Sequence, residues 1–177
     1  MTTIGKLAMG MMGRLRPRPA TGGGTSVIEL PLANRHGGMP LMDALDRRRS
    51  SREFASTPLP LAVLADLLWA AYGVNRPDGG RTDPSAIDAQ EVDVYVALPE
   101  GAYHYDAAHH RLRLEASADI RRITGYQDFV DDAPLDLVFV ADYSRMHLVP
   151  ASQREAYAYV AAGAIAQNVY LYAAANG

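Results

Sequence analysis

The first half of the chain contains two stretches in which apolar residues recur at helical spacing. The first runs from Pro40 to Arg47, with a proline suited to the first helical turn and arginines at the end. The second begins after Pro60 and stops at Gly73, a residue type that often follows the last helical turn. We expect both helices to pack an apolar face inward. The residues that form these faces are Leu41, Met42, Leu45, Leu61, Leu64, Ala65, Leu68 and Tyr72.

Alternating patterns dominate the middle of the chain and predict strands. Residues 92–98 carry Val92, Val94, Val96 and Leu98 at alternate positions and predict a largely buried strand. Residues 102–105 and 111–115 flank a short polar segment and predict a hairpin with one exposed face. A serine at the start of residues 117–124 indicates the cap of a short helix, which a glycine closes. Residues 135–140 predict a further strand.

The last element, from Gln153 to Ala175, is rich in alanine and tyrosine and carries few charges. We expect a long helix that is buried on much of its circumference. Helices and strands interleave along the chain without regular β–α–β repeats, and no glycine fingerprint follows a strand as a Rossmann fold or a P-loop requires. The pattern therefore predicts an α+β fold in which helices cover a sheet.

Composition narrows the range of functions. The chain has 177 residues, of which 49% are hydrophobic, and this suits one domain of ordinary size. The formal net charge of -3 gives no positive field for nucleic acid, and the absence of cysteine excludes thiolate catalysis, Cys-ligated zinc and iron–sulfur clusters. Any redox chemistry therefore requires a bound cofactor. No metal site is predicted, because His109 and His110 are adjacent on a turn and no carboxylates at ligand spacing accompany them.

The N-terminal region differs in composition from the rest of the chain. Between residues 14 and 24, arginines alternate with prolines and then give way to three glycines, a composition that cannot bury apolar surface. The apolar stretch before it is too short for a secretory signal, and no run approaches the about 20 apolar residues of a membrane-spanning helix. We therefore expect a flexible leader over residues 1–38, one domain over residues 39–177, and a cytoplasmic protein that binds no membrane.

Two polar segments are candidates for a binding site. Residues 47–54 read Arg-Arg-Arg-Ser-Ser-Arg-Glu-Phe, and guanidinium forks with hydroxyls suit a phosphate, although basic residues at a helix end also complement the helix dipole. Residues 81–90 read Arg-Thr-Asp-Pro-Ser-Ala-Ile-Asp-Ala-Gln, and small residues there would let a flat ring approach the backbone. The same composition is typical of a connecting loop. The residues alone leave both alternatives open.

Taken together, the two segments resemble the motifs of the nitroreductase-like FMN oxidoreductases. Residues 48–54 match the motif R-R-S-x-R-x-F at every defined position. Residues 84–90 match the motif P-S-x-x-N-x-Q, except that Asp88 stands in place of the asparagine. Three further segments are similar to the branch of the family related to azoline-forming dehydrogenases: residues 67–79, 87–98 and 166–172.

This resemblance implies an α+β fold with a mainly antiparallel sheet flanked by helices, and a homodimer with FMN at the subunit interface. It implies that the FMN phosphate, ribityl chain and pyrimidine edge contact Arg48, Arg49, Ser50 and Arg52. It also implies that Pro84, Ser85, Ala86, Asp88 and Gln90 line the isoalloxazine ring. Family members continue beyond the equivalent of Gly177, so the C-terminal part of the domain is expected to be missing. No catalytic residue is assigned.

The activity that the resemblance implies is the reduction of a nitro compound, quinone or similar small-molecule acceptor by NAD(P)H, through alternating reduction and oxidation of the flavin. A dehydrogenase of the azoline type, acting on a peptide heterocycle, is an alternative within the family. A non-catalytic flavin-binding or interaction protein is an alternative from another class. A yellow protein that bleaches with NADH or NADPH would favour the enzyme.

Overall fold

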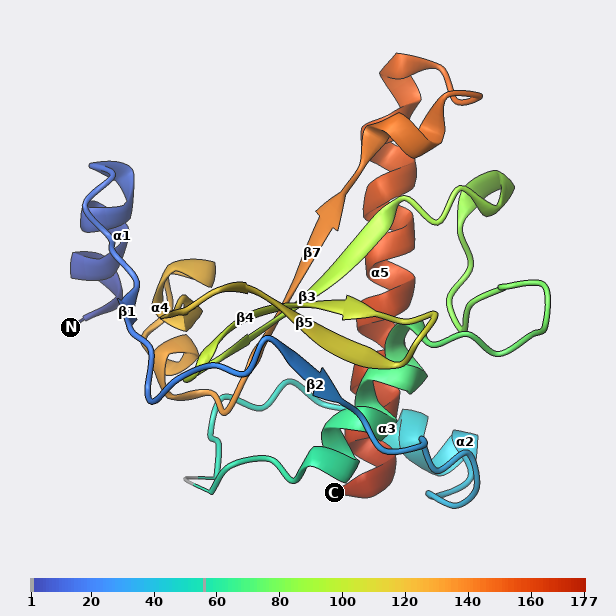
Figure 1. The fold of residues 1–177 in the computed structure, drawn as a ribbon, viewed down its shortest axis with the longest axis horizontal. Helices are drawn as coiled ribbons and strands as arrows, with labels where there is room; N and C mark the ends of the chain where they lie inside the picture. Colours follow the sequence, from blue (N-terminus) through green and yellow to red (C-terminus); the bar gives the residue numbers. More distant parts are fainter. Residues whose placement is uncertain (1, 56) are drawn as a thin grey trace.

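The computed structural model describes residues 2–55 and 57–177. Its centre is a five-stranded antiparallel sheet in the order β2-β5-β4-β3-β7 (Figure 1). The strands of this sheet are β2 (Val27–Glu29), β3 (Val92–Leu98), β4 (Gly101–Asp106), β5 (Arg111–Ala116) and β7 (Asp136–Ala141). The predicted strand at 92–98, the hairpin after it and the strand near 135–140 are confirmed, as is the α+β class with a mainly antiparallel sheet.

Three helices pack together beside this sheet (Figure 1). They are α2 (Leu41–Arg47), α3 (Leu61–Tyr72) and α5 (Ala151–Asn176). Shorter elements complete the chain: α1 (Thr3–Met11), β1 (Arg18–Pro19), η1 (Ala86–Asp88), β6 (Ala118–Asp119), α4 (Arg121–Thr124), η2 (Asp128–Asp132) and η3 (Tyr143–Met146). Among the described helices, none has the length and apolar character that crossing a bilayer demands.

The core lies between α3, α5 and one face of the sheet. Because side chains alternate along a strand, the valines at 92, 94 and 96 all point to this face, where they are at most 2% exposed. Leu68 of α3 and Ile165 of α5 are fully buried against the same cluster. Burial of these aliphatic side chains is the main driving force that holds the helices on the sheet.

The register of β7 decides what lies next to the start of β3. The two strands run antiparallel, and Val92 pairs with Ala141 at one end while Ala97 pairs with Asp136 at the other. The chain leaving β7 therefore enters η3 beside the point at which the preceding loop enters β3. This arrangement brings Gln90 and Arg145, which are 55 positions apart in sequence, into contact.

The N-terminal region differs from the flexible leader expected over residues 1–38. β2 forms the edge of the main sheet by pairing with β5, and β1 pairs with β6 in a separate two-stranded sheet. Lys6 of α1 is buried and forms an ion pair with Asp131 of η2. The proline- and glycine-rich composition predicts no packed core for this region. It does not reveal the edge pairing or the buried cation that connect it to the rest of the chain.

Two expectations about shorter helices need correction. The apolar residues of α2 do not face inward, since Leu41 and Met42 are 62% and 73% exposed. The helix expected from residue 117 is confined to Arg121–Thr124, because Ala118–Asp119 pairs with β1 and the Asp119 carboxylate, rather than a serine hydroxyl, accepts the backbone N–H of Arg121.

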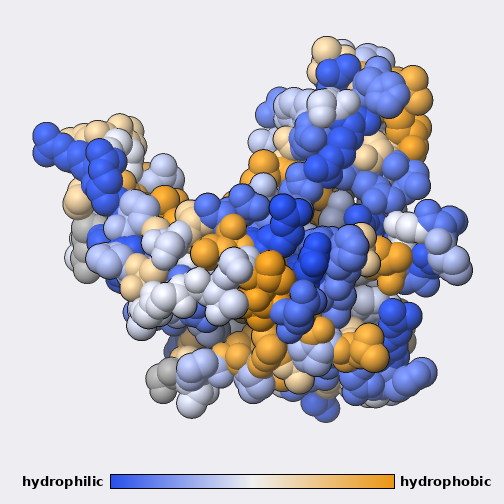
Figure 2. Space-filling model, in the orientation of Figure 1, coloured by the Kyte–Doolittle hydropathy of each residue, from blue (hydrophilic) through white to orange (hydrophobic). Residues whose placement is uncertain are grey.

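The long helix α5 is also less buried than its composition suggested. Within this helix, which the structure describes in full, the buried residues are Ala158, Ala161 and Ile165, whereas Tyr159 and Val160 are 71% and 69% exposed. Figure 2 shows the surface of the face seen in Figure 1, with apolar patches among polar residues and with α1 and the segment between β7 and α5 projecting from the body.

Candidate functional site

The second motif, residues 84–90 of the predicted loop at 81–90, includes η1, leads into β3 and has an unusual backbone. Ile87, Asp88 and Gln90 have φ angles of 53°, 53° and 47°, in the left-handed region that residues with side chains rarely occupy. Each such residue costs on the order of 1–3 kcal/mol and persists only when its surroundings hold it, and strained residues of this kind cluster at ligand-binding sites. We call residues 84–90 the strained loop.

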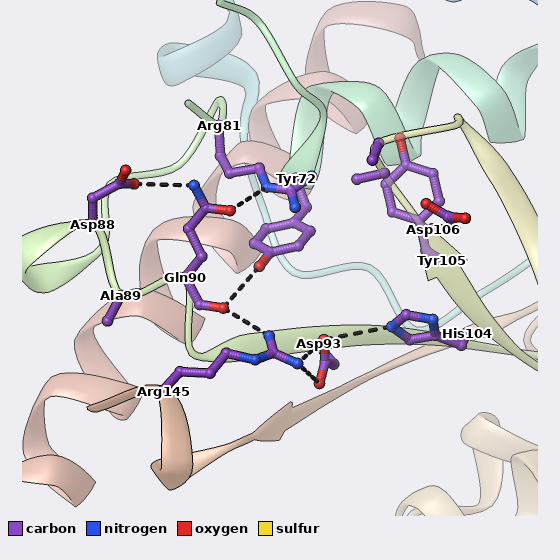
Figure 3. Close-up of a pocket in the computed structure, with 12 residues that line it drawn as sticks. Tyr72, Arg81, Asp88, Ala89, Gln90, Asp93, His104, Tyr105, Asp106 and Arg145 are labelled. Carbon is purple, nitrogen blue, oxygen red and sulfur yellow. Dashed lines mark hydrogen bonds and ion pairs between the residues drawn. The ribbon is translucent and has the colours of Figure 1, made fainter. Parts of the chain in front are cut away.

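Gln90 is the centre of the hydrogen-bond network that holds the strained loop (Figure 3). Its backbone N–H donates to Ser85 Oγ at 2.9 Å, and its side-chain Nε2 donates to Asp88 Oδ1 at 3.1 Å and to the Gly79 carbonyl at 3.3 Å. Its side-chain Oε1 accepts from Arg81 Nε at 3.0 Å. Both N–H groups of the Gln90 amide are therefore used within the protein.

The backbone carbonyl of Gln90 accepts two further hydrogen bonds. The Tyr72 hydroxyl at the end of α3 donates at 3.3 Å, and Arg145 Nη1 of η3 donates at 2.9 Å. Burial raises the pKa of Tyr72 to about 12, so this hydroxyl keeps its proton and remains a donor at physiological pH. Arg81 lies over the Tyr72 ring with its guanidinium carbon 4.6 Å from the ring centre, and this contact holds the side chains of Arg81 and Tyr72 relative to each other.

Arg145 is itself held by carboxylates. Its Nη2 donates to both oxygens of Asp93, at 2.9 and 2.7 Å, and its Nε lies 3.3 Å from Asp142 Oδ2. Asp93 points away from the core because it alternates with Val92 and Val94 on β3. His104 Nε2 of β4 lies 3.4 Å from the same Asp93 carboxylate.

These groups surround a polar hollow of about 370 Å³, which we call the loop hollow. Its volume falls in the range of about 300–1,000 Å³ that small-molecule sites occupy. Arginine and carboxylate side chains both line it, so it offers donors and acceptors to a polar ligand edge. It is lined by Tyr72, Arg81, Asp88, Ala89, Gln90, Asp93, His104, Tyr105, Asp106, Ala107, Ala108 and Arg145.

Two buried carboxyl groups flank the strained loop in sequence. Asp83 is 6% exposed, and burial raises its pKa to about 6, with the negative charge of Glu91 adding to the effect and the Asp83 backbone and Arg81 opposing it. Glu91 is fully buried, and neither of its carboxylate oxygens has a hydrogen-bond partner among the described residues. Arg81 Nη1 is buried without a partner in the same part of the chain. The base of the strained loop therefore contains polar groups that the described residues leave unsatisfied.

The basic segment lies on a different part of the surface. It is irregular chain after α2, and Arg49, Ser50 and Arg52 are exposed. Arg48 lies over the ring of Tyr170 on α5 at 5.9 Å, and Arg52 lies over the ring of Phe129 in η2 at 5.8 Å.

Arg48 and Arg49 line an open hollow of about 1270 Å³ between this segment and the C-terminal end of α5, which we call the basic hollow. Ser50 and Arg52 do not line it. Among the described residues, no ion pair involves Arg48, Arg49 or Arg52. These guanidinium groups are available to an anion.

Within one chain the structure keeps the two predicted segments apart. The basic hollow and the loop hollow share no lining residue. Of the predicted ring-contacting residues, Asp88 and Gln90 line the loop hollow, whereas Pro84, Ser85 and Ala86 do not. Ser85 instead accepts the Gln90 N–H and so stabilises the turn. Whether these residues contact a cofactor stays a prediction.

Sequence reasoning assigned no place in this site to eight residues that line the loop hollow and lie outside both polar segments: Tyr72, Asp93, His104, Tyr105, Asp106, Ala107, Ala108 and Arg145. The alternation on β3 gave a signal for Asp93, since a polar residue between buried valines must point to the opposite face. For Arg145 the sequence offered none, because its contact with Gln90 depends on the register of β7. The histidines 104, 109 and 110 belong to no metal-binding group among the described residues.

Comparison with known proteins agrees with the fold. A model of the nitroreductase family matches residues 45–177. A protein from Methanocaldococcus jannaschii that is provisionally assigned to the nitroreductases is 34% identical over 165 residues, covering 88% of this chain and 82% of its own length. A crystal structure from Ralstonia eutropha with the same provisional assignment superposes with a TM-score of 0.88 at 56% identity, over 92% of this chain and 78% of that one.

A more distant crystal structure, from Anabaena variabilis, has a TM-score of 0.62 at 22% identity. It covers 75% of this chain and 30% of that chain, and it supports the fold alone.

Proposed function

The chain belongs to the nitroreductase family, a family of flavin-dependent oxidoreductases, and on that premise we propose that it binds FMN and catalyses NAD(P)H-linked reduction of a small-molecule acceptor. The observation that carries the proposal is the pairing of an arginine-lined hollow with a strained loop that matches the second family motif except at Asp88. When bound, FMN would supply the hydride and electron transfer.

The basic hollow suits the phosphate of FMN. Arg48 and Arg49 face it, and neither forms an ion pair among the described residues, although Asp46 and Glu53 also line the hollow. Guanidinium groups form forked, charge-assisted hydrogen bonds with phosphoryl oxygens. The hollow is also large enough for more than a phosphate, and this allows the ribityl chain to lie in it. In this proposal Arg48 and Arg49 bind the phosphate, while Ser50 and Arg52 contribute from the rim.

The strained loop suits the edge of the isoalloxazine ring. Residues with side chains in the left-handed region turn the backbone sharply, and here they do so where small residues, Ser85, Ala86 and Ala89, leave little bulk. The hydrogen bonds of Gln90 hold that shape without a ligand. In this proposal Pro84, Ser85, Ala86 and Asp88 lie along the ring, and Gln90 shapes the loop from behind.

We propose that the complete site forms between two copies of the chain. The two motifs lie in separate hollows, so one copy does not bring them together. An exposed stripe of uncharged and mostly small or apolar residues runs along α5 at helical spacing, formed by Ala156, Val160, Gly163, Gln167 and Tyr170. Exposed apolar surface of this kind marks protein interfaces.

Both motifs adjoin this helix. Tyr170 belongs to the stripe and also lines the basic hollow. Asn168 Nδ2 of α5 lies 3.4 Å from the Thr82 carbonyl, two residues before the strained loop. Two copies that pack through α5 would therefore bring the basic hollow of one towards the strained loop of the other. The homodimer, with FMN at its interface, explains the separation of the motifs within one chain.

The reaction would take electrons from NADH or NADPH and pass them to a nitro compound, a quinone or a similar acceptor. The azoline-type dehydrogenase remains the alternative within the family, suggested by the segments at 67–79, 87–98 and 166–172. It differs in the direction of electron flow, because a peptide heterocycle would be oxidised. An assay with each class of substrate separates the two.

The test begins with the purified protein and added FMN. We expect a yellow protein whose bound flavin bleaches anaerobically with NADH or NADPH and recovers its colour with a quinone or a nitroaromatic compound. FMN occupancy should rise with the dimer fraction measured by light scattering. A protein that binds no FMN in either oligomeric state would overturn the proposal and favour a non-catalytic interaction protein.

A further inference from the structure

The strained loop needs support from outside its own sequence. Three of its seven residues have left-handed φ angles, and one of them, Ile87, is β-branched and especially unsuited to that conformation. The internal backbone hydrogen bonds are few: Asp88 N–H donates to the Ser85 carbonyl at 3.3 Å and Ala89 N–H donates to the Ala86 carbonyl at 3.1 Å. Contacts at Gln90, where the loop enters β3, therefore determine whether the conformation persists.

Arg145 provides the most constrained of these contacts. One nitrogen donates to the Gln90 carbonyl at 2.9 Å, and another donates to both carboxylate oxygens of Asp93 on β3. Its Nε faces Asp142 after the end of β7. Figure 3 shows the guanidinium between the loop and the strand. A planar group whose three nitrogens are all engaged leaves the Gln90 carbonyl little freedom to rotate.

We propose that Arg145, held by Asp93, is a positioning residue that locks the strained loop in the conformation suited to the flavin ring. The link to the flavin rests on the proposed function, but the contact that holds the loop involves only residues of this chain. Arg145 acts through the Gln90 carbonyl and is assigned no contact with the flavin.

Two simpler roles for Arg145 account for less of its geometry. If Arg145 only neutralised Asp93, its hydrogen bond to the uncharged Gln90 carbonyl would have no function. A role in binding a substrate in the loop hollow is disfavoured because its nitrogens already face two carboxylates and a carbonyl. Tyr72 supports the same carbonyl with a longer bond of 3.3 Å, so the loop retains some support when Arg145 is removed.

The experiment measures hydrogen exchange of the amides of residues 88–90 in the flavin-free protein, together with FMN affinity. In Arg145→Ala we expect these amides to exchange about tenfold to a hundredfold faster and FMN affinity to fall by a similar factor, as loss of a charge-assisted hydrogen bond allows. Arg145→Lys keeps the charge without the planar fork and should recover part of both effects.

A matched control is Arg154→Ala. Arg154 also donates to a backbone carbonyl, that of Val149 at 3.0 Å, but it lies on α5 and does not line the loop hollow. Exchange of residues 88–90 should be unchanged in this variant. Asp93→Asn provides a second route if Arg145→Ala does not fold. When Asp93→Asn and Arg145→Lys are combined, the increase in the exchange rate of residues 88–90 should be smaller than the sum of the two separate increases, because both substitutions disturb the same contact.

The outcomes separate the lock from the proposed function. If the parent protein binds FMN and Arg145→Ala shows normal loop exchange, the lock is overturned while the function stands. If the parent binds no FMN, the proposed function fails and the exchange data alone decide on the lock. Faster exchange confined to residues 88–90, with partial recovery in Arg145→Lys, supports it in either case.

Discussion

Asp88 Oδ1 accepts a hydrogen bond from Gln90 Nε2 at 3.1 Å across the tip of the strained loop. This contact occupies one lone pair of a carboxylate that stands where the family motif has an asparagine. A carboxylate can only accept hydrogen bonds, whereas an amide can also donate. The residue therefore keeps the loop contact but changes the charge beside the proposed flavin ring.

The first prediction concerns that charge. We expect Asp88→Asn to raise the midpoint potential of bound FMN and to speed its reduction by NAD(P)H at neutral pH, because reduction places negative charge on the pyrimidine end of the flavin and a nearby carboxylate opposes it. The amide oxygen can still accept from Gln90, so thermal stability should change little. A potentiometric titration with equal midpoints in both proteins, at neutral and alkaline pH, would contradict a charge effect of Asp88.

The second prediction separates the arginines of the basic segment. Arg48 lines the basic hollow and Arg52 does not, so Arg48→Ala should weaken FMN binding about tenfold to a hundredfold and Arg52→Ala should weaken it less. Arg113→Ala, which removes an exposed arginine outside both hollows, is the control. Fluorescence titration measures the affinities. Equal FMN affinity in the parent and Arg48→Ala would show that Arg48 does not bind the phosphate.

The third prediction concerns the interface on α5. Val160 is 69% exposed in the middle of the stripe, so Val160→Glu should leave the folded chain intact while placing two like charges close together in the proposed dimer. We expect a monomer by light scattering and a parallel loss of FMN occupancy. Ser117→Glu adds the same charge at an exposed site remote in sequence from α5 and should leave the oligomer unchanged. A dimer that persists in Val160→Glu with full flavin would place the interface elsewhere.

The fourth prediction uses the buried carboxyl of Asp83. Burial raises its pKa from the ordinary value of 3.8 to about 6 in the folded protein. Below pH 3.8 the carboxyl is protonated in both the folded and the unfolded state, so it costs the folded protein no stability there. As the pH rises towards 6 the unfolded chain ionises freely while the folded protein must ionise a buried group, and stability falls by up to about 3 kcal/mol.

The variant Asp83→Asn removes this ionisation. As the pH is raised from about 4 to about 7, the free energy of unfolding of the flavin-free parent should therefore fall relative to that of the flavin-free variant. Chemical denaturation at both pH values measures it, with Asp43→Asn as the control on an exposed carboxylate of α2. If the gap is the same at both pH values, burial does not penalise the Asp83 charge.

The sequence by itself determined the elements whose patterns are local. Alternating valines predicted β3, and Pro60 with Gly73 marked the two ends of α3, because these signals depend on side-chain periodicity and backbone preferences within a few residues. The two motifs likewise identified the candidate site. Their arginines, small residues and glutamine indicate a binding site by their chemical type, before any contact is known.

Only the tertiary structure decided how those elements meet. The exposed face of α5 contradicted its alanine-rich pattern, because α2, α3 and the sheet together leave part of that helix uncovered. The left-handed backbone conformation of Ile87 and Asp88 could not be predicted from the residue types of the loop. Arg145 reaches Gln90 because the register of β7 on β3 sets η3 beside the loop, and strand register is a property of the whole sheet that no single segment encodes.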